Sequence, residues 1–500
     1  MKKIFTLLLV AMTAVVARAT DYIVPVTVVV NDVTSEQLGE FSIVENDGLY
    51  DVSLKNFILD SENGPMGVGN VELKGIQPYQ DGKATLFVTE KEVTITDGDD
   101  PNVVYWMAGM LPPVNVLLRG KIEDEHLYMN LYIDLMETMD QIIQVTVGEG
   151  YQMPNPGFEL WHPSDETHVE PDGWHSFETA TGALAAFGGH HLTKSKNAHS
   201  GEACARIYSS SILGIVANGT MTTGRLNADA MIATDPANNA YLDTSMPELD
   251  GAGKPFYIPL YSRPDSIAVW VRFRQGSVNP DHPYANISAV ITDGTYYQDP
   301  EDKVYTNVVA KAKNDKIATT DGEWVRVTAP FVYTENAVEP KAILVTISTN
   351  ADAGQGSDGD EVLVDDIELI YNAKVTGLKI NGQDVPGFST DVFEYEMELE
   401  QGVTTEDIEV VVEGQSTHVI KDVSFIDSNV CTVMALGGDM KHMSTYVIRE
   451  KGSGTGIRSI KTPAGQSAYY TLDGRQAKTL APGRIYIRRQ ADGTVTKVRL

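Results

Sequence analysis

Short stretches in which apolar and polar residues alternate recur along the whole chain, and this pattern constrains the fold most. In residues 50–55, Tyr, Val and Leu alternate with Asp, Ser and Lys, as expected for a strand with one buried face. Many of these stretches are separated by Asx-Gly pairs, which suit hairpin turns because both residues tolerate positive φ. These pairs lie at 47–48, 97–98, 293–294, 321–322, 381–382, 473–474 and 492–493. Since the sequence contains no convincing long amphipathic helix, it predicts an all-β protein.

Composition limits both the number of domains and the choice of partners. The chain has 500 residues, of which 42% are apolar, enough for about three or four folded units. Its formal net charge of −31 argues against nucleic acid and against anionic membrane surfaces, because both require clustered Lys and Arg. The two cysteines, Cys204 and Cys431, give neither a disulfide framework nor a CxxC metal pair.

The first 19 residues show the three parts of a secretory signal peptide. Lys2 and Lys3 precede an apolar run at 4–16, and residues 17–19 (Ala-Arg-Ala) form a small-x-small cleavage site. The run is too short to span a bilayer, and no later segment is apolar for long enough to be a transmembrane segment. Because no cysteine follows the run, a lipoprotein anchor is not expected. The sequence predicts export to the cell surface or the medium, with the periplasm as the alternative.

Turn-rich breaks and changes in composition divide the mature chain into several units. A Gly/Ser-rich linker lies at 452–456. Residues 451–500 carry ten Lys+Arg and two Asp+Glu, a net charge of +8 on an otherwise acidic protein. The predicted units are 20–148, 155–372, 373–450 and a tail at 457–500.

The first unit resembles the calycin-like β-barrel domains at the front of exported Bacteroidetes proteins. The resemblance lies in residues 22–28 (YIVPVTV) and 48–57 (GLYDVSLKNF). It implies a closed eight-stranded barrel, which removes exposed strand edges. Such a barrel either holds one small apolar ligand or is filled by its own side chains.

The second unit resembles a carbohydrate-metabolism domain of gut and oral Bacteroidetes. It opens with NPGFELW at 155–161 and PDGW at 171–174, contains IAVWVRF at 267–273, and closes with VLVDDIELIY at 362–371. The resemblance implies a galactose-binding-like jelly roll, similar to many carbohydrate-binding modules. It therefore implies a carbohydrate context for this unit.

That resemblance also implies a structural calcium ion. In a jelly roll the first and last strands lie side by side, which would bring Glu159 close to Asp365 and Asp366. Clustered carboxylates repel one another unless a cation neutralises them, and Ca²⁺ binds carboxylate and backbone carbonyl oxygens. We therefore predict Ca²⁺ on Glu159, Asp365, Asp366 and the Gly157 carbonyl. In the alternative interpretation, these acids face water at turns and sheet edges.

Aromatic residues in polar, turn-rich sequence are candidates for contacts with sugar. A sugar site needs aromatic faces for CH groups and a few polar side chains. The candidates are Tyr284, Tyr296, Tyr297 and Tyr305. The alternative is that these four are ordinary strand aromatics.

The histidines and tryptophans are predicted to have structural roles rather than to form a metal site. Six of the ten histidines lie within residues 162–199, with no HExxH and no other metal-ligand spacing. This favours surface loops around a binding face over a metal site. The core is expected to contain Trp174, Trp270 and Trp324, which lie in strand-like runs.

The last two segments carry resemblances of their own. Residues 377–382 (GLKING), 386–389 (PGFS) and Tyr395 resemble cadherin-like β-sandwich domains of bacterial surface proteins, which implies a spacer. Residues 469–475 (YYTLDGR) and 483–489 (GRIYIRR) are similar to the type IX C-terminal sorting domains of Bacteroidetes. That similarity implies passage across the outer membrane through a secretion machinery. The alternative is a small basic β-element that docks onto the acidic remainder of the chain.

Together these features predict an exported protein that binds glycan or polysaccharide at the bacterial cell surface. The first alternative is a glycoside hydrolase, which would need two carboxylates of the central unit at a set separation. A second alternative is a structural or adhesive surface protein. The sequence contains neither a G-x-S-x-G nucleophile elbow nor a phosphate loop, and no catalytic residue is assigned.

Overall fold

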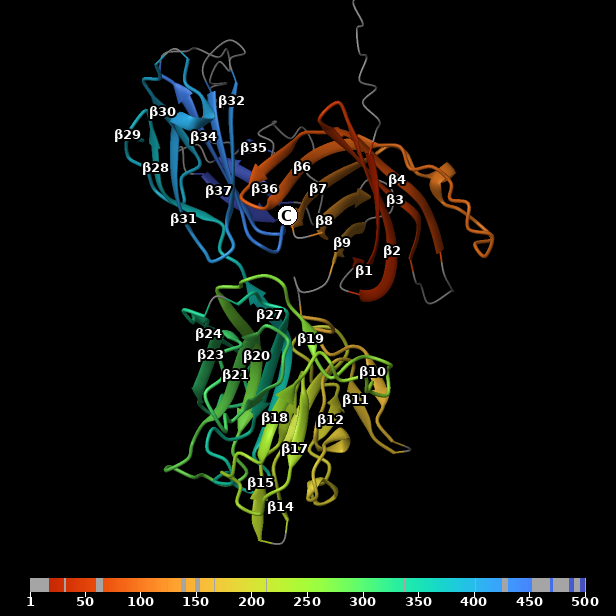
Figure 1. The fold of residues 1–500 in the computed structure, drawn as a ribbon, viewed down its shortest axis with the longest axis vertical. Helices are drawn as coiled ribbons and strands as arrows, with labels where there is room; N and C mark the ends of the chain where they lie inside the picture. The colour runs from red at the N-terminus through yellow and green to blue at the C-terminus, as the bar shows by residue number, and fades with distance from the viewer. Residues whose placement is uncertain are drawn as a thin grey trace, which may run out of the picture.

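Figure 1 shows the fold of the chain in a computed structural model. The described residues are 18–30, 33–59, 66–123, 125–135, 141–148, 153–165, 167–212, 214–336, 338–400, 402–424, 430–451, 468–470, 485–489 and 495–499. They form strands β1 to β37 and four short 3₁₀ helices, with no α-helix among them, so the predicted all-β fold is confirmed. None of these described helices is long and apolar enough to cross a bilayer. Residues 1–17, the 452–456 linker and most of the predicted tail lie outside the described residues.

One antiparallel sheet of nine strands forms the first unit, in the order β4-β3-β2-β1-β9-β8-β7-β6-β5. This is one strand more than the closed eight-stranded barrel that the resemblance implies, and in the described residues no pairing between β4 and β5 closes the sheet. It curls into a barrel-like shape (Figure 1). Phe41, Phe57 and Phe87 belong to its buried cluster, so side chains pack the core of this unit. Its elements are β1 Arg18–Val30, β2 Val33–Asn46, β3 Leu49–Leu59, β4 Met66–Ile76, β5 Pro78–Asp81, β6 Ala84–Val93, η1 Ala108–Met110, β7 Val114–Glu123, β8 His126–Leu135 and β9 Gln141–Val147.

Two sheets that face each other across one core form the second unit. Their orders are β12-β13-β27-β20-β24 and β16-β26-β21-β23-β25, and β19 also pairs with β26. A small sheet, β17-β18-β22, packs on the outer face of the second sheet through a separate apolar cluster. The backbone N–H of Ile367 donates to the Pro156 carbonyl over 2.9 Å, so the opening segment lies against β27 as the sequence predicts.

The elements of the second unit are β10 Trp161–Pro163, β11 Val169–Pro171, η2 Phe177–Thr179, η3 Ala185–Phe187, β12 Leu192–Ser195, β13 Cys204–Tyr208, β14 Ser210–Ile212, β15 Ile215–Ala217, β16 Thr220–Thr222, β17 Arg225–Ala228, β18 Asn238–Leu242, β19 Ile258–Pro259, β20 Ser266–Arg274, β21 Ala285–Thr292, β22 Tyr297–Asp299, β23 Val308–Ile317, β24 Val325–Pro330, β25 Val332–Tyr333, β26 Ala342–Ser348 and β27 Glu361–Ile370.

The third unit is a smaller sandwich of the sheets β29-β28-β31 and β30-β34-β33-β32. Its core includes Tyr395 and Tyr446, with Phe388 packed against them. The sheet β35-β36-β37 belongs to the predicted tail. The elements are β28 Lys374–Ile380, β29 Gln383–Asp384, β30 Glu394–Met397, η4 Thr405–Asp407, β31 Ile408–Glu413, β32 His418–Ser424, β33 Val430–Leu436, β34 Met443–Glu450, β35 Ala468–Tyr470, β36 Ile485–Arg489 and β37 Val495–Arg499.

The third unit contacts both of its neighbours. Towards the first unit, an apolar cluster joins Leu86 of β6 to Leu436 and Met440. Towards the second unit, the Asp265 carboxylate accepts a hydrogen bond from the backbone N–H of Gln415 (2.9 Å), and the Ser416 hydroxyl donates to the Arg263 carbonyl (3.0 Å). Within the described residues, the third unit thus contacts both of the other units, and the first and second units also meet where His126 stacks on Tyr261.

Candidate functional site

A pocket of about 590 Å³ lies between the small sheet β17-β18-β22 and the outer face of β21, β23 and β26. Along β21, Asn286, Ser288 and Val290 line the pocket, while the alternate residues of the strand belong to the main core. The strand period of two therefore gives β21 one face for packing and one face for the pocket.

Side-chain amides dominate the polar lining of this pocket. The side-chain oxygens of Asn218, Asn239 and Asn286 are buried, and no described residue donates a hydrogen bond to them. A buried amide oxygen without a partner costs about 1–3 kcal/mol. These three oxygens therefore suit donors that come from outside the described chain. The asparagines that line the pocket are Asn218, Asn227, Asn238, Asn239, Asn286 and Asn350.

The charged groups of the pocket are already paired within the chain. Lys311 Nζ lies 2.6 Å from Glu301 Oε1, and Lys313 Nζ lies 3.5 Å from Asp315 Oδ2. The Ser288 hydroxyl donates to Asp299 Oδ2 over 2.8 Å. Because both lysines have carboxylate partners and the Asp299 carboxylate already accepts a hydrogen bond, the pocket suits an uncharged polar ligand better than an ion.

The four predicted tyrosines do not form one aromatic surface. Tyr297 lines the pocket, but it is almost fully buried in the small apolar cluster and packs edge-on against Tyr305 at a ring distance of 5.0 Å. Tyr296 is partly exposed, and its hydroxyl donates to Gln298. Tyr284 is partly exposed, and its backbone carbonyl accepts from Ala351. The structure thus stacks Tyr297 edge-on with Tyr305, while the Tyr296 ring contacts Tyr241 instead.

Three of the four predicted calcium residues lie together at the edge of β27. A Cβ atom added to Gly157 would lie 3.5 Å from Asp366 Oδ1 and 3.8 Å from Asp365 Oδ1, so the backbone of Gly157 adjoins both carboxylates. Glu159 instead accepts hydrogen bonds from the N–H groups of Glu202 (2.9 Å) and Ala203 (3.2 Å). In charge and position, Gly157, Asp365 and Asp366 fit a cation site, whereas Glu159 is directed to a neighbouring turn.

Asp365 and Asp366 are also held by groups of the chain itself. Asp365 is fully buried and accepts from the backbone N–H groups of His199 (2.7 Å) and Ser200 (3.3 Å). Asp366 Oδ1 accepts a hydrogen bond from the Ser200 hydroxyl (2.8 Å), and Asp366 Oδ2 lies 2.6 Å from His199 Nδ1. Burial, followed by the adjacent charge of Asp366, raises the pKa of Asp365 to about 7. This carboxyl pair therefore binds either a proton or a cation more readily than isolated acids do.

The tryptophan prediction is correct for one residue and wrong for two. Trp174 is fully buried in the main core. Trp270 and Trp324 are only half-buried, and the His199 ring stacks on Trp270 at 3.9 Å. In β20, Trp270 alternates with the core residues Val269 and Val271, so its side chain faces outwards. The sequence alone does not show on which face of its sheet each tryptophan side chain lies.

The expectation that the clustered histidines occupy surface loops is wrong for three of them. Each of these rings is buried and uses its Nδ1 atom to hold a neighbouring segment. The pairs are His162 with Asp172 Oδ1 (2.9 Å), His175 with the Gly224 carbonyl (2.7 Å) and His191 with the Tyr208 carbonyl (2.7 Å).

The sequence reasoning missed the asparagine pocket. Four of its six asparagines lie within residues 218–239, a region rich in a residue type that strands usually avoid. That local enrichment was a usable signal. The contributions of Asn286 and Asn350 depend on strand pairing across long sequence distances, which the sequence alone did not provide.

Comparisons with known proteins give little further information. No family model matches the chain, and no curated protein matches its sequence. A candidate glycoside hydrolase from Bacteroides thetaiotaomicron is 14% identical with a TM-score of 0.32, over 64% of this chain and 87% of the other.

Two further solved structures show weaker similarity. A structure of promiscuous carbohydrate-binding modules of the β-sandwich superfamily is 9% identical with a TM-score of 0.20, over 66% and 97% of the two chains. A candidate outer membrane protein from Bacteroides fragilis is 10% identical with a TM-score of 0.18, over 66% and 96%. TM-scores this low carry no argument about fold or function, so the site must be interpreted from its own geometry.

Proposed function

We propose that this chain is an exported carbohydrate-binding protein whose pocket between β17-β18-β22 and β21-β23-β26 holds a neutral sugar. The observation that carries this proposal is the set of three buried asparagine oxygens, in Asn218, Asn239 and Asn286, that lack donors in the described chain. Sugar hydroxyl groups supply such donors. They also accept hydrogen bonds, so amide side chains are suitable partners.

The remaining lining of the pocket supports the same class of ligand. Phe177, Val290 and Tyr297 provide apolar surface next to the amides. A sugar ring presents CH groups on its faces and hydroxyl groups at its rim, so it needs both kinds of contact. A strongly charged ligand would have to break the Lys311–Glu301 ion pair.

We expect Asn286→Leu to weaken glycan binding by about 5- to 150-fold, as the loss of one buried hydrogen bond of ~1–3 kcal/mol implies. A glycan array would identify the ligand, and calorimetry with that ligand would measure the affinity. Asn314→Leu is the matched control, because Asn314 lies on the neighbouring strand β23 and bonds the Thr328 carbonyl. Equal affinity in wild type and Asn286→Leu would contradict the assignment of the pocket.

A hydrolase is the second candidate, because two carboxylates, Asp299 and Glu301, line the same pocket. Glycosidases use such a pair as acid and as nucleophile or base. The bonds from Ser288 to Asp299 and from Lys311 to Glu301 favour binding over proton transfer. New reducing ends released from polysaccharide by the wild type, and lost in Asp299→Asn, would establish the hydrolase instead. A protein with neither binding nor hydrolysis would be a structural or adhesive one.

Export is part of this proposal and has its own test. Cleavage after Ala19 would remove two of the thirteen residues of β1 and leave most of its pairing with β2 intact. Mass spectrometry of the exported protein should find Thr20 at its N-terminus, whereas an intact Met1 would contradict processing.

Deletion of 457–500 should retain the protein in the periplasm if the basic tail is a sorting signal. Normal surface delivery of the shortened chain would exclude that role.

We also propose a structural Ca²⁺ on Asp365, Asp366 and the Gly157 backbone. The adjacency of Gly157 to two crowded carboxylates supports it. When bound, the ion would neutralise the repulsion between the two acids. It would also join the opening segment of the second unit to β27, the last strand of that unit.

A further inference from the structure

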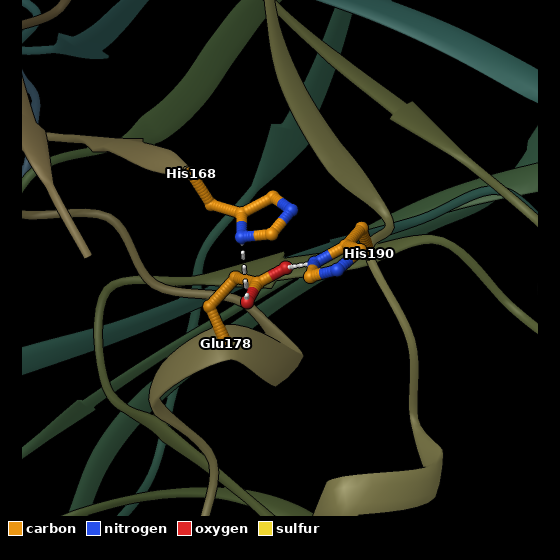
Figure 2. Close-up of side chains that lie close together, drawn as sticks. All are labelled: His168, Glu178 and His190. Carbon is orange, nitrogen blue, oxygen red and sulfur yellow. Dashed lines mark hydrogen bonds and ion pairs between the residues drawn. The ribbon is translucent and has the colours of Figure 1, made fainter. Parts of the chain in front are cut away.

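Two histidines and a glutamate from three separate segments converge on one side of the second unit. His168 lies at the end of the β10–β11 loop, Glu178 in the 3₁₀ helix η2, and His190 just before β12. One potential ligand atom from each residue lies within 4.8 Å of the other two. Figure 2 shows both imidazole rings beside the Glu178 carboxylate.

The three groups lie close together, with the Glu178 carboxylate next to both imidazole rings. His190 Nδ1 is hydrogen-bonded to Glu178 Oε1, and His168 Nδ1 lies 3.9 Å from Glu178 Oε2. The two rings stack face to face with centroids 3.3 Å apart and an angle of 18° between their planes. A neutral imidazole ring has one nitrogen with a lone pair that can bind a metal ion.

The backbone of each ligand segment is fixed by neighbouring hydrogen bonds. Asp165 accepts from the N–H groups of Thr167 (2.6 Å) and His168 (2.7 Å) and lies 2.7 Å from His168 Nδ1. The buried carboxylate of Glu170 accepts from both the N–H and the hydroxyl of Ser176 at 2.6 Å, which holds the start of η2. These bonds pre-organise the side chains before any ligand arrives.

The position of His190 is fixed by its neighbour. His191 is fully buried and bonds the Tyr208 carbonyl through Nδ1 at 2.7 Å. The His190 side chain, by contrast, is about half exposed, whereas the Glu178 side chain is only 9% exposed. The cluster therefore has an almost buried carboxylate on one side and an opening to solvent on the other.

We propose that His168, Glu178 and His190 form a binding site for Zn²⁺, with an open position that faces solvent. Two imidazole nitrogens and one carboxylate are a ligand set that zinc accepts, whereas Ca²⁺ and Mg²⁺ prefer oxygen alone. Zinc bonds of about 2.0–2.2 Å require the ligand atoms, now within 4.8 Å of one another, to close in and one of the stacked imidazole rings to turn towards the ion. Asp165 and Glu178 together supply two negative charges, which balance the charge of the ion.

Zinc binds an imidazole nitrogen through its lone pair, so a proton on the same nitrogen competes with the ion. Zinc affinity should therefore fall as the pH is lowered, because protons compete for the same nitrogens. The inference is independent of sugar binding, since none of its three ligands lines the asparagine pocket.

The test uses the full exported chain, freed of metal and titrated with Zn²⁺ by calorimetry. We expect one zinc per chain at this site, and Co²⁺ in its place should give the visible absorption of a low-symmetry site with nitrogen and oxygen ligands. Glu178→Gln and His190→Ala should each weaken zinc binding at least tenfold. His282→Ala is the matched control, because His282 pairs with one carboxylate, Asp352, at 2.7 Å without a second histidine.

A second measurement does not depend on whether the variants fold. In the wild type, Zn²⁺ should protect His168 and His190, but not His282, from acylation by diethyl pyrocarbonate, as mapped by mass spectrometry. Zinc binding of equal affinity in wild type and both variants would overturn the proposal. So would equal competition by Ca²⁺, or unchanged acylation of His168 and His190 in the presence of zinc.

Discussion

Asp439→Ala is expected to destabilise the junction between the first and third units by about 1–3 kcal/mol, because it leaves three partly buried donors without their buried acceptor. Asp439 is fully buried and accepts from the N–H groups of Lys441 (3.0 Å) and His442 (3.2 Å), and lies 2.6 Å from His442 Nδ1. These bonds hold a tight turn in which Met440 has a φ of +52° and enters the apolar cluster with Leu86. Calorimetry should show that the melting of the first unit separates from that of the third.

The pH dependence of this effect has a defined sign. The hydrogen bond to Asp439 raises the pKa of His442 above its ordinary value. The stabilisation from the charged pair is therefore complete below the unfolded pKa of about 6.5 and is lost as the pH rises through the folded value. The difference between wild type and variant should be larger at pH 6 than at alkaline pH.

Two further variants separate the junction from a general loss of charge. Asp439→Asn keeps an oxygen acceptor for the backbone N–H groups and should cost less than Asp439→Ala. Asp352→Ala removes the carboxylate from a His–Asp pair of similar geometry that is exposed, and should change stability by less than about 1 kcal/mol. If Asp439→Ala and Asp352→Ala have equal effects, the buried turn is not what joins the two units.

In calcium-free buffer, the stability of the wild type is expected to decrease as the pH rises from about 4 to about 7. Asp365→Asn is expected to abolish this decrease. Burial and the Asp366 charge raise the folded pKa of Asp365 to about 7, whereas the unfolded value is about 3.9. The folded state therefore holds an extra proton between these limits. Its stabilising contribution is complete below the unfolded pKa and is lost as the pH rises through the folded one.

Calcium should reverse this decrease if Asp365 and Asp366 bind it. At pH 8 the carboxylates are ionised, so added Ca²⁺ would stabilise the folded state by RT ln(1 + [L]/Kd), about 2.7 kcal/mol at a hundredfold excess over Kd. Chelation with EGTA should lower the melting temperature of the wild type and leave that of Asp365→Asn unchanged. Glu159→Gln should keep the calcium response, because Glu159 bonds Glu202 and Ala203 instead. A wild type that is insensitive to both Ca²⁺ and EGTA would exclude the ion.

The sequence predicted what depends on local pattern and missed what depends on long-range pairing. Alternation and Asx-Gly turns are local, so the all-β fold followed from them. The meeting of Gly157 with Asp365 and Asp366 was predicted because a resemblance supplied the strand neighbours. The direction of Glu159, the outward face of Trp270 and the contacts of Asn286 depend on which side of a sheet each residue faces. A bulge between β20 and β27 changes that side within a few residues, so counting along the sequence cannot give it.

The position of η2 connects the two proposed sites through thermodynamic linkage. Phe177 lines the asparagine pocket, and the adjacent Glu178 belongs to the histidine cluster, within one 3₁₀ helix of three residues. If zinc shifts this helix and thereby changes sugar affinity by some factor, sugar must change zinc affinity by the same factor. If both proposed sites are occupied as described, zinc would then set how much sugar the protein binds. The same three residues would allow the abundance of glycan to determine how much zinc the protein retains.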